Sequence, residues 1–244
     1  MKLLRFGTEI DLENETIDKD KNRIMISLLK NCYNSYSQEY FNKLYEETPN
    51  KRKSFTFSIY MGDCEFLREE ILIPDKKIYL NFSTSDIEDG IMFYNSILTN
   101  KGREFSIKDN TLKIGKISML KEKNIYSNEA IFKTMSPIVA REHKGNNSKT
   151  WYHSLNYLKG KETFMDNLKY QLIGEFGESR ILDIKEMEAE ILFNKEVKVK
   201  HYGIEVLSNL CRIKITAKPY ILGYIYKAGI GSMKSAGFGM VDLV

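Results

Sequence analysis

Hydrophobic and polar positions follow two different periods in the first half of the chain. Residues 54–61 alternate aromatic or aliphatic side chains with polar ones, which is typical of a strand with one buried face. Residues 2–10 and 77–83 also predict strands. Apolar residues recur at helical spacing within residues 18–45. This predicted helix ends before Pro49, because proline disfavours a helical conformation in the residue that precedes it.

The rest of the first half completes a regular order of elements. Ser85 with the acids at 86 and 88 predicts a helix start capped by the serine. Residues 103–107 and 111–120 then return to extended character. The order strand, helix, strand, strand, helix, strand predicts a ferredoxin-like domain over residues 1–124.

The second half repeats this order without repeating the residues. Its predicted elements are a strand at 130–139, a helix at 162–176, long strands at 187–202 and 204–218, a helix at 219–226 and a closing strand at 237–243. We therefore expect an α+β fold of tandem ferredoxin-like (RRM-like, βαββαβ) domains. The second domain is expected over residues 125–244.

Composition narrows the class of protein. The chain has 244 residues, of which 42% are hydrophobic and 29% charged, as in an ordinary globular protein. Its three cysteines are far apart, so neither a disulfide framework nor a zinc cluster is expected. No apolar run approaches the ~18 residues of a membrane span, and the start lacks the apolar region of a secretory signal. We expect a cytoplasmic protein with no membrane segment, cofactor or metal.

Positive charge is concentrated locally, although the net charge is only +4. Lys198 and Lys200 alternate with valines, and Arg212 and Lys214 alternate with isoleucines. If the two strands pair, these four cations share an outward face suited to an RNA phosphate backbone. Solvated surface lysines are the alternative interpretation.

A glycine-rich segment lies near the end of the chain. Glycines permit positive φ and close backbone approach, so successive amides can form a concavity that binds anions. A turn that packs tightly on a sheet is the alternative explanation. The candidate RNA-binding residues of this segment are Gly229, Gly231, Ser232, Lys234, Ser235, Gly237 and Gly239.

Three segments, in order, resemble those of one family. Residues 228–241 are similar to the C-terminal glycine-rich loop of the CRISPR-associated repeat-processing endoribonucleases of the RAMP superfamily. Residues 53–58 (KSFTFS) resemble that family's lysine followed by an aromatic-Thr-aromatic-Ser strand. Residues 134–139 (TMSPIV) resemble its Leu-Ser-Pro-Ile strand. The resemblance spans the chain and implies the same tandem ferredoxin-like fold.

The resemblance implies a function and its partners. Members of this family cut CRISPR repeat RNA without a metal: the 2′-hydroxyl attacks the adjacent phosphate and leaves a 2′,3′-cyclic phosphate. The expected partners are therefore CRISPR repeat RNA, the mature crRNA and subunits of a CRISPR effector complex. A homodimer is among the oligomeric states left open.

The resemblance also points to candidate catalytic residues. Family members often carry a tyrosine, a histidine and a lysine at positions that fall here at Lys30, Tyr45 and Lys53, so that only the lysine is retained. One hypothesis is that Tyr45 donates a proton, with its pKa lowered by the two lysines, which stabilise the phosphorane. A second is that His143, the first histidine of the chain, reaches the phosphate from a loop at 141–145.

Two further points stay open at the sequence level. Lys51 and Arg52 form a basic triplet with Lys53, which is a candidate RNA contact or a solvated turn. The missing first-domain histidine also permits a non-catalytic relative that binds repeat RNA, or a structural subunit of an effector complex. An unrelated RRM-like binder is a weaker alternative, because the aromatic signature of RRM strands is absent.

Overall fold

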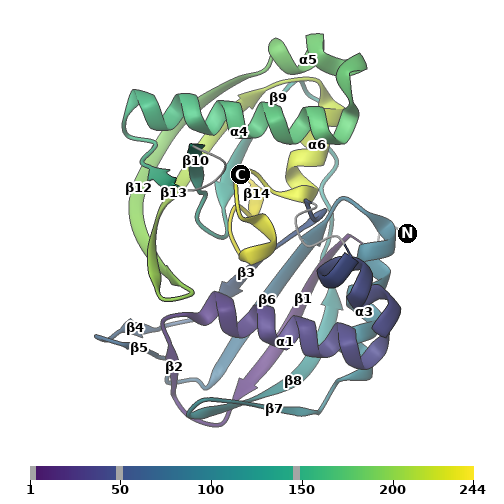
Figure 1. The fold of residues 1–244 in the computed structure, drawn as a ribbon, viewed down its shortest axis with the longest axis vertical. Helices are drawn as coiled ribbons and strands as arrows, with labels where there is room; N and C mark the ends of the chain where they lie inside the picture. The colour runs from purple at the N-terminus through teal and green to yellow at the C-terminus, as the bar shows by residue number, and fades with distance from the viewer. Residues whose placement is uncertain (1–3, 48–51, 145–148) are drawn as a thin grey trace. The chain divides into compact units, whose positions relative to one another are not determined.

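The computed structural model describes residues 4–47, 52–144 and 149–244 (Figure 1). The chain divides into two compact units. The first comprises Met1–Glu122 with Lys200–Ile204, and the second Lys123–Val199 with Glu205–Val244. Both are mixtures of strands and helices, which confirms the predicted α+β class.

The first unit is built on a five-stranded sheet of order β3-β6-β1-β8-β7. The strands are β1 (Arg5–Leu12), β3 (Phe55–Tyr60), β6 (Lys77–Thr84), β7 (Glu104–Ile107) and β8 (Asn110–Met119), and the long helices are α1 (Lys21–Tyr36) and α3 (Ile87–Thr99). All of the neighbouring strands pair antiparallel. Without the edge strand β7, the order is that of a ferredoxin-like domain, as predicted.

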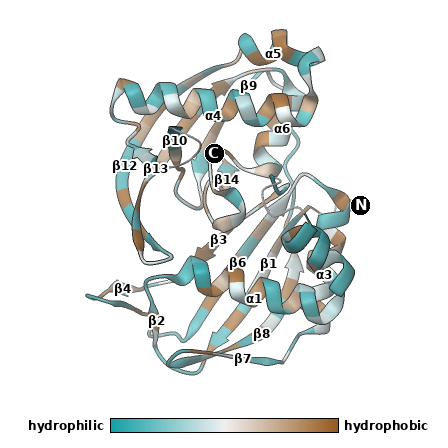
Figure 2. Cartoon of the chain, viewed as in Figure 1, coloured by the Kyte–Doolittle hydropathy of each residue, from teal (hydrophilic) through white to brown (hydrophobic). Residues whose placement is uncertain are grey.

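The core of this unit lies between the sheet and the two helices. Phe82 and Phe93 stack with ring centroids 3.8 Å apart, and Phe6 lies 5.4 Å from Phe93. Leu28 and Cys32 of α1 are buried in the same cluster. Hydrophobic and hydrophilic positions alternate along α1 (Figure 2), as expected for a helix with one buried side. Each buried side chain of this size contributes about 1.5–3 kcal/mol.

The predicted first helix is interrupted. The backbone of Ser37 is extended, with φ −151° and ψ 104°, and its hydroxyl accepts a hydrogen bond of 3.2 Å from the Tyr40 amide. The chain therefore restarts as the short α2 (Gln38–Asn42) and continues in a π-helical turn, Lys43–Glu47. A small sheet of order β2-β5-β4 was not predicted. Its strands are β2 (Thr16–Asp18), β4 (Glu65–Phe66) and β5 (Glu70–Leu72).

The second unit repeats the same strand order. Its sheet has the order β12-β13-β9-β14. Taken in chain order, the strands of this sheet are β9, β12, β13 and β14, and they occupy the same positions in the sheet as β1, β3, β6 and β8 do in the first unit. The strands are β9 (Glu129–Thr134), β12 (Glu188–His201), β13 (Ile204–Thr216) and β14 (Val241–Leu243), and the helices are α4 (Leu158–Phe176), α5 (Ile181–Lys185) and α6 (Pro219–Ala228). The prediction of a second ferredoxin-like domain is confirmed at the level of topology.

Two features of this unit differ from the prediction. A hairpin of β10 (Ala140–Lys144) and β11 (Lys149–His153) follows the first strand, where a loop was expected. The closing strand begins at Val241 instead of residue 237, because Gly237 and Gly239 have positive φ values of 84° and 70° that no strand accommodates. Short 3-10 helices occupy Glu178–Arg180 and Lys234–Ala236. Among the described residues, no helix is long and apolar enough to cross a membrane.

Candidate functional site

Three of the four predicted catalytic residues meet in the first unit. Tyr45 lies in the π-helical turn, Lys30 on α1, and Lys53 two residues before β3. The Nζ atoms of Lys30 and Lys53 lie 4.7 Å and 5.0 Å from the centroid of the Tyr45 ring. Both distances are those of cation–π contacts, so the ring brings two positive charges together.

The break at Ser37 positions this tyrosine. Because α2 leaves α1 at an angle set by the extended Ser37, the aromatic residues that follow pack back onto the unit. The Tyr40 ring meets Tyr33 edge-on at 5.3 Å, and Phe41 lies 5.3 Å from Tyr45. Tyr40 is buried in the core of this unit, so it anchors the segment that carries Tyr45.

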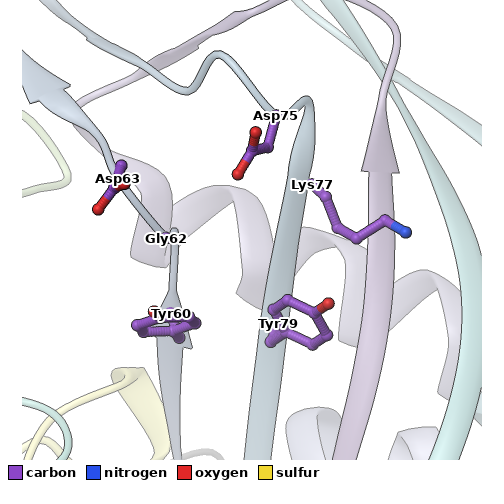
Figure 3. A pocket seen from close by; sticks show the side chains of 6 residues that line it. All are labelled: Tyr60, Gly62, Asp63, Asp75, Lys77 and Tyr79. Atoms are coloured by element: carbon purple, nitrogen blue, oxygen red, sulfur yellow. The ribbon is translucent and has the colours of Figure 1, made fainter.

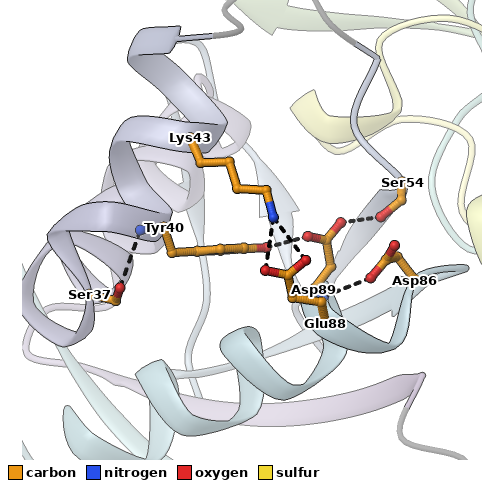
Figure 4. Close-up of polar contacts among 7 residues, drawn as sticks. All are labelled: Ser37, Tyr40, Lys43, Ser54, Asp86, Glu88 and Asp89. Carbon is orange, nitrogen blue, oxygen red and sulfur yellow. Dashed lines mark hydrogen bonds and ion pairs between the residues drawn. The ribbon is translucent and has the colours of Figure 1, made fainter.

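A half-buried polar cluster lies beside the three residues (Figure 4). Asp89, in the first turn of α3, accepts hydrogen bonds from the Tyr40 hydroxyl and from the Ser54 hydroxyl. The Ser54 oxygen also lies 2.9 Å from Thr84 Oγ1. Ser54 follows Lys53 directly, so this cluster fixes the backbone from which Lys53 projects.

The helix start that carries Asp89 was predicted with the wrong cap. The side chain of Asp86, and not that of Ser85, accepts the hydrogen bond of 3.2 Å from the Asp89 amide. Ser85 instead donates to the backbone oxygen of Ser54 at 3.4 Å. The helix therefore begins at Ile87, with Asp89 in its first turn, facing Ser54.

The electrostatics of the site differ from the expectation for Tyr45. Burial raises the pKa of the Tyr45 phenol, and the nearby Asp89 carboxylate raises this pKa further. The expectation that flanking lysines lower the pKa is wrong, because burial disfavours the phenolate more than the cations favour it. Tyr45 therefore keeps its proton at neutral pH.

Lys53 and Asp89 also have shifted pKa values. Burial and the charge of Lys30 lower the pKa of Lys53, while Asp89 opposes this shift. Burial raises the pKa of Asp89, although the hydrogen bonds from Ser54 and Tyr40 act in the opposite direction. Lys53 thus holds its proton less tightly than an ordinary lysine does.

The fourth predicted catalytic residue, His143, belongs to the second unit. It is an exposed residue of β10 and not part of a loop, and its Nδ1 lies 3.0 Å from Thr150 Oγ1 on β11. Partial burial and the charge of Arg141 lower the pKa of His143. The ring is therefore neutral at neutral pH and can accept a proton.

The basic residues of the long hairpin formed by β12 and β13 alternate with more buried neighbours, as predicted. On β13, Arg212 is exposed and Ile213 is buried. Lys214 forms an ion pair of 3.0 Å with Glu129 on β9. On β12, Lys198 is exposed and pairs with Glu205 at 3.0 Å.

The other three predicted basic contacts are Lys200, Arg52 and Lys51. Lys200 is the next-to-last residue of β12, the strand beside β13 in the sheet. Arg52 is exposed before β3. Lys51 lies outside the described residues.

The glycine-rich segment packs against its own unit. The amides of Ile230, Ser232 and Gly239 donate to the backbone oxygens of Gly239, Val139 and Pro137 at 2.9–3.0 Å. These amides are therefore engaged within the protein, which supports the packing alternative for this part of the segment.

Side chains hold the same segment. Gln171 of α4 donates to the Gly229 oxygen at 2.9 Å, and the Ser232 hydroxyl donates to Asn167 Oδ1 at 3.0 Å. Lys234 and Ser235 lie in the 3-10 helix, which ends at Gly237 with its φ of 84°. Lys234 Nζ lies 5.7 Å from the centroid of the Tyr224 ring.

Asp89, Tyr40 and Ser54 were not predicted as site residues from the sequence. Asp89 has the sequence signal of an ordinary acidic residue in a first helical turn, and Tyr40 that of a core residue. These three side chains come together through tertiary contacts between α2, α3 and the start of β3, which cannot be predicted from local sequence patterns. Within residues 4–47, 52–144 and 149–244, no group of three or more His, Cys, Asp or Glu side chains is placed to hold a metal ion.

Comparison with known proteins identifies the family. The family model described as CRISPR associated protein Cas6, C-terminal, matches residues 120–243. No curated protein matches the sequence. One similar structure, described as a Cas6-related gene product from Pyrococcus furiosus, is 21% identical, covers 99% of this chain and 98% of its own, and has a TM-score of 0.82.

Two further solved structures share the fold. One, described as an RAMP protein binding different RNA substrates, is 23% identical with 99% of each chain covered and a TM-score of 0.80. Another, described as CRISPR associated protein Cas6, is 22% identical with 99% of each chain covered and a TM-score of 0.75. The family model matches more than half of the sequence, and the tandem ferredoxin-like fold extends over the whole chain. The chain belongs to the Cas6 family of CRISPR-associated proteins.

Proposed function

We propose that this protein is an endoribonuclease that cuts CRISPR repeat RNA within pre-crRNA to give mature crRNA. Its membership of the Cas6 family supports this proposal, as does the likeness to a structure described as binding different RNA substrates. The observation that carries the proposal is the convergence of Lys30 and Lys53 on the ring of Tyr45.

The proposed reaction is a transesterification that uses no metal. The 2′-hydroxyl attacks the adjacent phosphorus and loses its proton to a base, the bond to the 5′-oxygen breaks, and a 2′,3′-cyclic phosphate and a 5′-hydroxyl result. A negative phosphorane forms on the way. Lys53 and Lys30 offer two positive charges within one site to stabilise that phosphorane.

Tyr45 is the proposed proton donor to the departing 5′-oxygen. Its raised pKa keeps the phenol protonated at neutral pH, which suits an acid and not a base. Asp89 is a proposed positioning residue, because its hydrogen bonds to Ser54 and Tyr40 hold the chain on both sides of the Tyr45–Lys53 pair. His143 is the alternative proton-transfer group, contributed by the second unit.

The proposed RNA-binding surface includes the basic residues of the long hairpin and the segment before β3. Lys198, Arg212 and Lys214 lie on paired strands, where they suit a series of phosphates. The ion pairs of Lys198 and Lys214 with glutamates reduce the charge that each offers. Lys51, Arg52 and Lys200 are proposed as further contacts, and CRISPR effector subunits as partners that receive the product.

The test uses end-labelled repeat RNA from the source organism, incubated with pure protein in excess EDTA. We expect a single cut with a cyclic phosphate at the 3′ end. Tyr45→Phe should lower the single-turnover rate about 100-fold or more through loss of the proton donor, and Lys53→Ala about as much through loss of the cation. Lys43→Ala is the matched control, since this exposed lysine lies two residues before Tyr45 and pairs with Glu88.

Other outcomes would assign the activity differently. If Tyr45→Phe and Lys53→Ala cut at the wild-type rate while His143→Ala does not, the chemistry belongs to His143. Tight binding without any cut would support the non-catalytic alternative, which the absence of a histidine before His143 favours.

A further inference from the structure

The first unit has a pocket that the proposed RNA chemistry does not use. It lies where β3 ends and β6 begins, has a volume of about 400 Å³, and is lined by Tyr60, Gly62, Asp63, Asp75, Lys77 and Tyr79 (Figure 3). Tyr60 pairs directly with Tyr79 across the two strands. Their neighbours Ile59 and Leu80 face the core, so both tyrosines lie on the opposite face of the sheet, away from the helices.

The two tyrosines form aromatic walls. Their ring centroids are 6.2 Å apart and the ring planes meet at 43°. Tyr60 is 61% exposed and Tyr79 37% exposed, so neither residue is part of the core. Aromatic rings placed in this way offer their faces to a flat or cationic group.

The charge at the pocket is negative, in contrast to the net charge of +4 of the whole chain. The carboxylates of Asp63 and Asp75 lie beyond the two rings at the same end of the strands (Figure 3). Lys77 extends away from the tyrosines, and its Nζ lies 3.6 Å from Asp11 on β1. Glu9 pairs with Tyr79 in the strand register and adds another acid to this end of the sheet.

The acids and aromatic rings of the pocket favour some ligand groups over others. Phosphate groups are repelled by the acids, so an RNA backbone does not suit this pocket. A planar guanidinium suits it, because it stacks on aromatic faces and donates parallel hydrogen bonds to a carboxylate. An ammonium group makes the charge interaction without the stacking or the bidentate geometry.

We infer that this pocket binds the guanidinium of an arginine side chain presented by a partner polypeptide. The guanidinium stacks against Tyr60 and Tyr79 and donates hydrogen bonds to Asp63 and Asp75. The inference is independent of the proposed RNA cleavage, because none of these residues belongs to the Lys30–Tyr45–Lys53 group.

The test titrates the intact protein with a blocked tripeptide, acetyl-Gly-Arg-Gly-amide, while NMR follows the ring signals of the tyrosines. The same peptide with citrulline, a neutral analogue of arginine, and the same peptide with lysine are the comparison ligands. We expect the arginine peptide to bind about tenfold or more tightly than the citrulline peptide and more tightly than the lysine peptide.

Substitutions test whether the arginine peptide binds in this pocket. Asp75→Asn and Asp63→Asn should each weaken binding of the arginine peptide several-fold, whereas Asp109→Asn, at an exposed aspartate elsewhere in the same unit, should leave it unchanged. All three variants should cut repeat RNA at the wild-type rate. Equal binding of the arginine and citrulline peptides would overturn the inference. So would guanosine monophosphate competing for the pocket, because that would make it a nucleobase site.

Discussion

Lys53 lies between one positive and one negative neighbour, and its proton affinity depends on both. Lys30 and burial lower its pKa, whereas Asp89 raises it. Lys43 of the π-helical turn, Glu88 of α3 and its cap Asp86 also act on Asp89 or are acted on by it, and all three stay in place when only Asp89 or Lys30 is substituted. Substitutions at these two positions therefore shift the pKa of Lys53 in opposite directions.

We predict opposite movements of the pH–rate profile. If cleavage needs protonated Lys53, the rate falls as pH rises through its pKa. Asp89→Asn removes the group that raises this pKa, so the falling limb should move to lower pH. Lys30→Met removes a group that lowers it, so the falling limb should move to higher pH, even though the maximal rate is also lower. Single-turnover rates measured from pH 6 to 10 test both variants.

The direction of the two movements distinguishes electrostatics from simple misfolding. A variant that only destabilises the fold lowers the rate at every pH without moving the limb. Ser54→Ala serves as the matched control for Asp89→Asn, because it removes one hydrogen bond to the carboxylate and leaves the charge. Movement of both limbs in the same direction would contradict the proposed role of Asp89.

At this scale, sequence patterns locate some site residues and miss others for physical reasons. Lys53 is recognisable because this lysine and the aromatic-Thr-aromatic-Ser strand after it resemble those of the family. Asp89 is not, because an acid in a first helical turn has the same pattern whether it faces solvent or a serine on another element. The raised pKa of Tyr45 is also invisible in the sequence, since burial decides it.

At the scale of elements, the glycine-rich segment depends on glycine for its close packing. A Cβ atom built at Gly239 would lie 1.9 Å from the Ile230 oxygen, and the φ of Gly239 is 70°. A Cβ at Gly231 would lie 3.0 Å from the Val139 oxygen. Gly239 thus permits a close backbone contact within the segment after α6, and Gly231 permits one between that segment and Val139, directly before β10.

We predict that Gly239→Ala destabilises the protein by more than about 3 kcal/mol, because a left-handed conformation is combined with a backbone clash. Gly177→Ala is the matched control: its φ is 73°, but a Cβ there meets nothing within 4 Å. It should cost about 1–3 kcal/mol from the conformation alone, because its ψ of 176° lies in a region that almost only glycine adopts. Chemical denaturation of both variants tests this difference. Equal losses of stability, with RNA binding weakened only in Gly239→Ala, would instead support the anion-binding role.

Elements with a strong hydrophobic period could be predicted from the sequence, whereas short elements could not. The second half of β13 alternates buried and more exposed positions, so its buried face can be read from the sequence. The prediction of one buried face is wrong for β3, because its polar Thr56 and Ser58 are buried together with the aromatic residues. Strand β10 has the sequence AREHK, and β4 has two residues, so neither has an apolar alternation to detect. They form because a neighbouring strand provides backbone partners.

The whole molecule repeats one topology with two different sets of residues. The order β3-β6-β1-β8 in one unit and β12-β13-β9-β14 in the other are the same when each is numbered along its own part of the chain. The proposed chemistry belongs to one unit, with Tyr45 and both lysines, and the basic hairpin belongs largely to the other. Cleavage and binding should therefore respond to different substitutions.

We predict a double dissociation between binding and cleavage. Tyr45→Phe keeps every charge, so the affinity for repeat RNA and the dependence of that affinity on salt should match the wild type while the cut is lost. Arg212→Ala removes one exposed cation, so the plot of log affinity against log salt should become shallower by about one counterion. At saturating RNA, its single-turnover rate should stay unchanged.

Binding measured between 50 and 300 mM salt, beside single-turnover cleavage, tests the dissociation. Lys185→Ala, at an exposed lysine of α5, is the control for loss of charge elsewhere in the second unit. A slope that falls equally in Arg212→Ala and Lys185→Ala would mean that RNA responds to the overall charge of the protein. A slope that falls only in Arg212→Ala would assign the phosphate contacts to the hairpin, because counterions are released only where phosphates are neutralised.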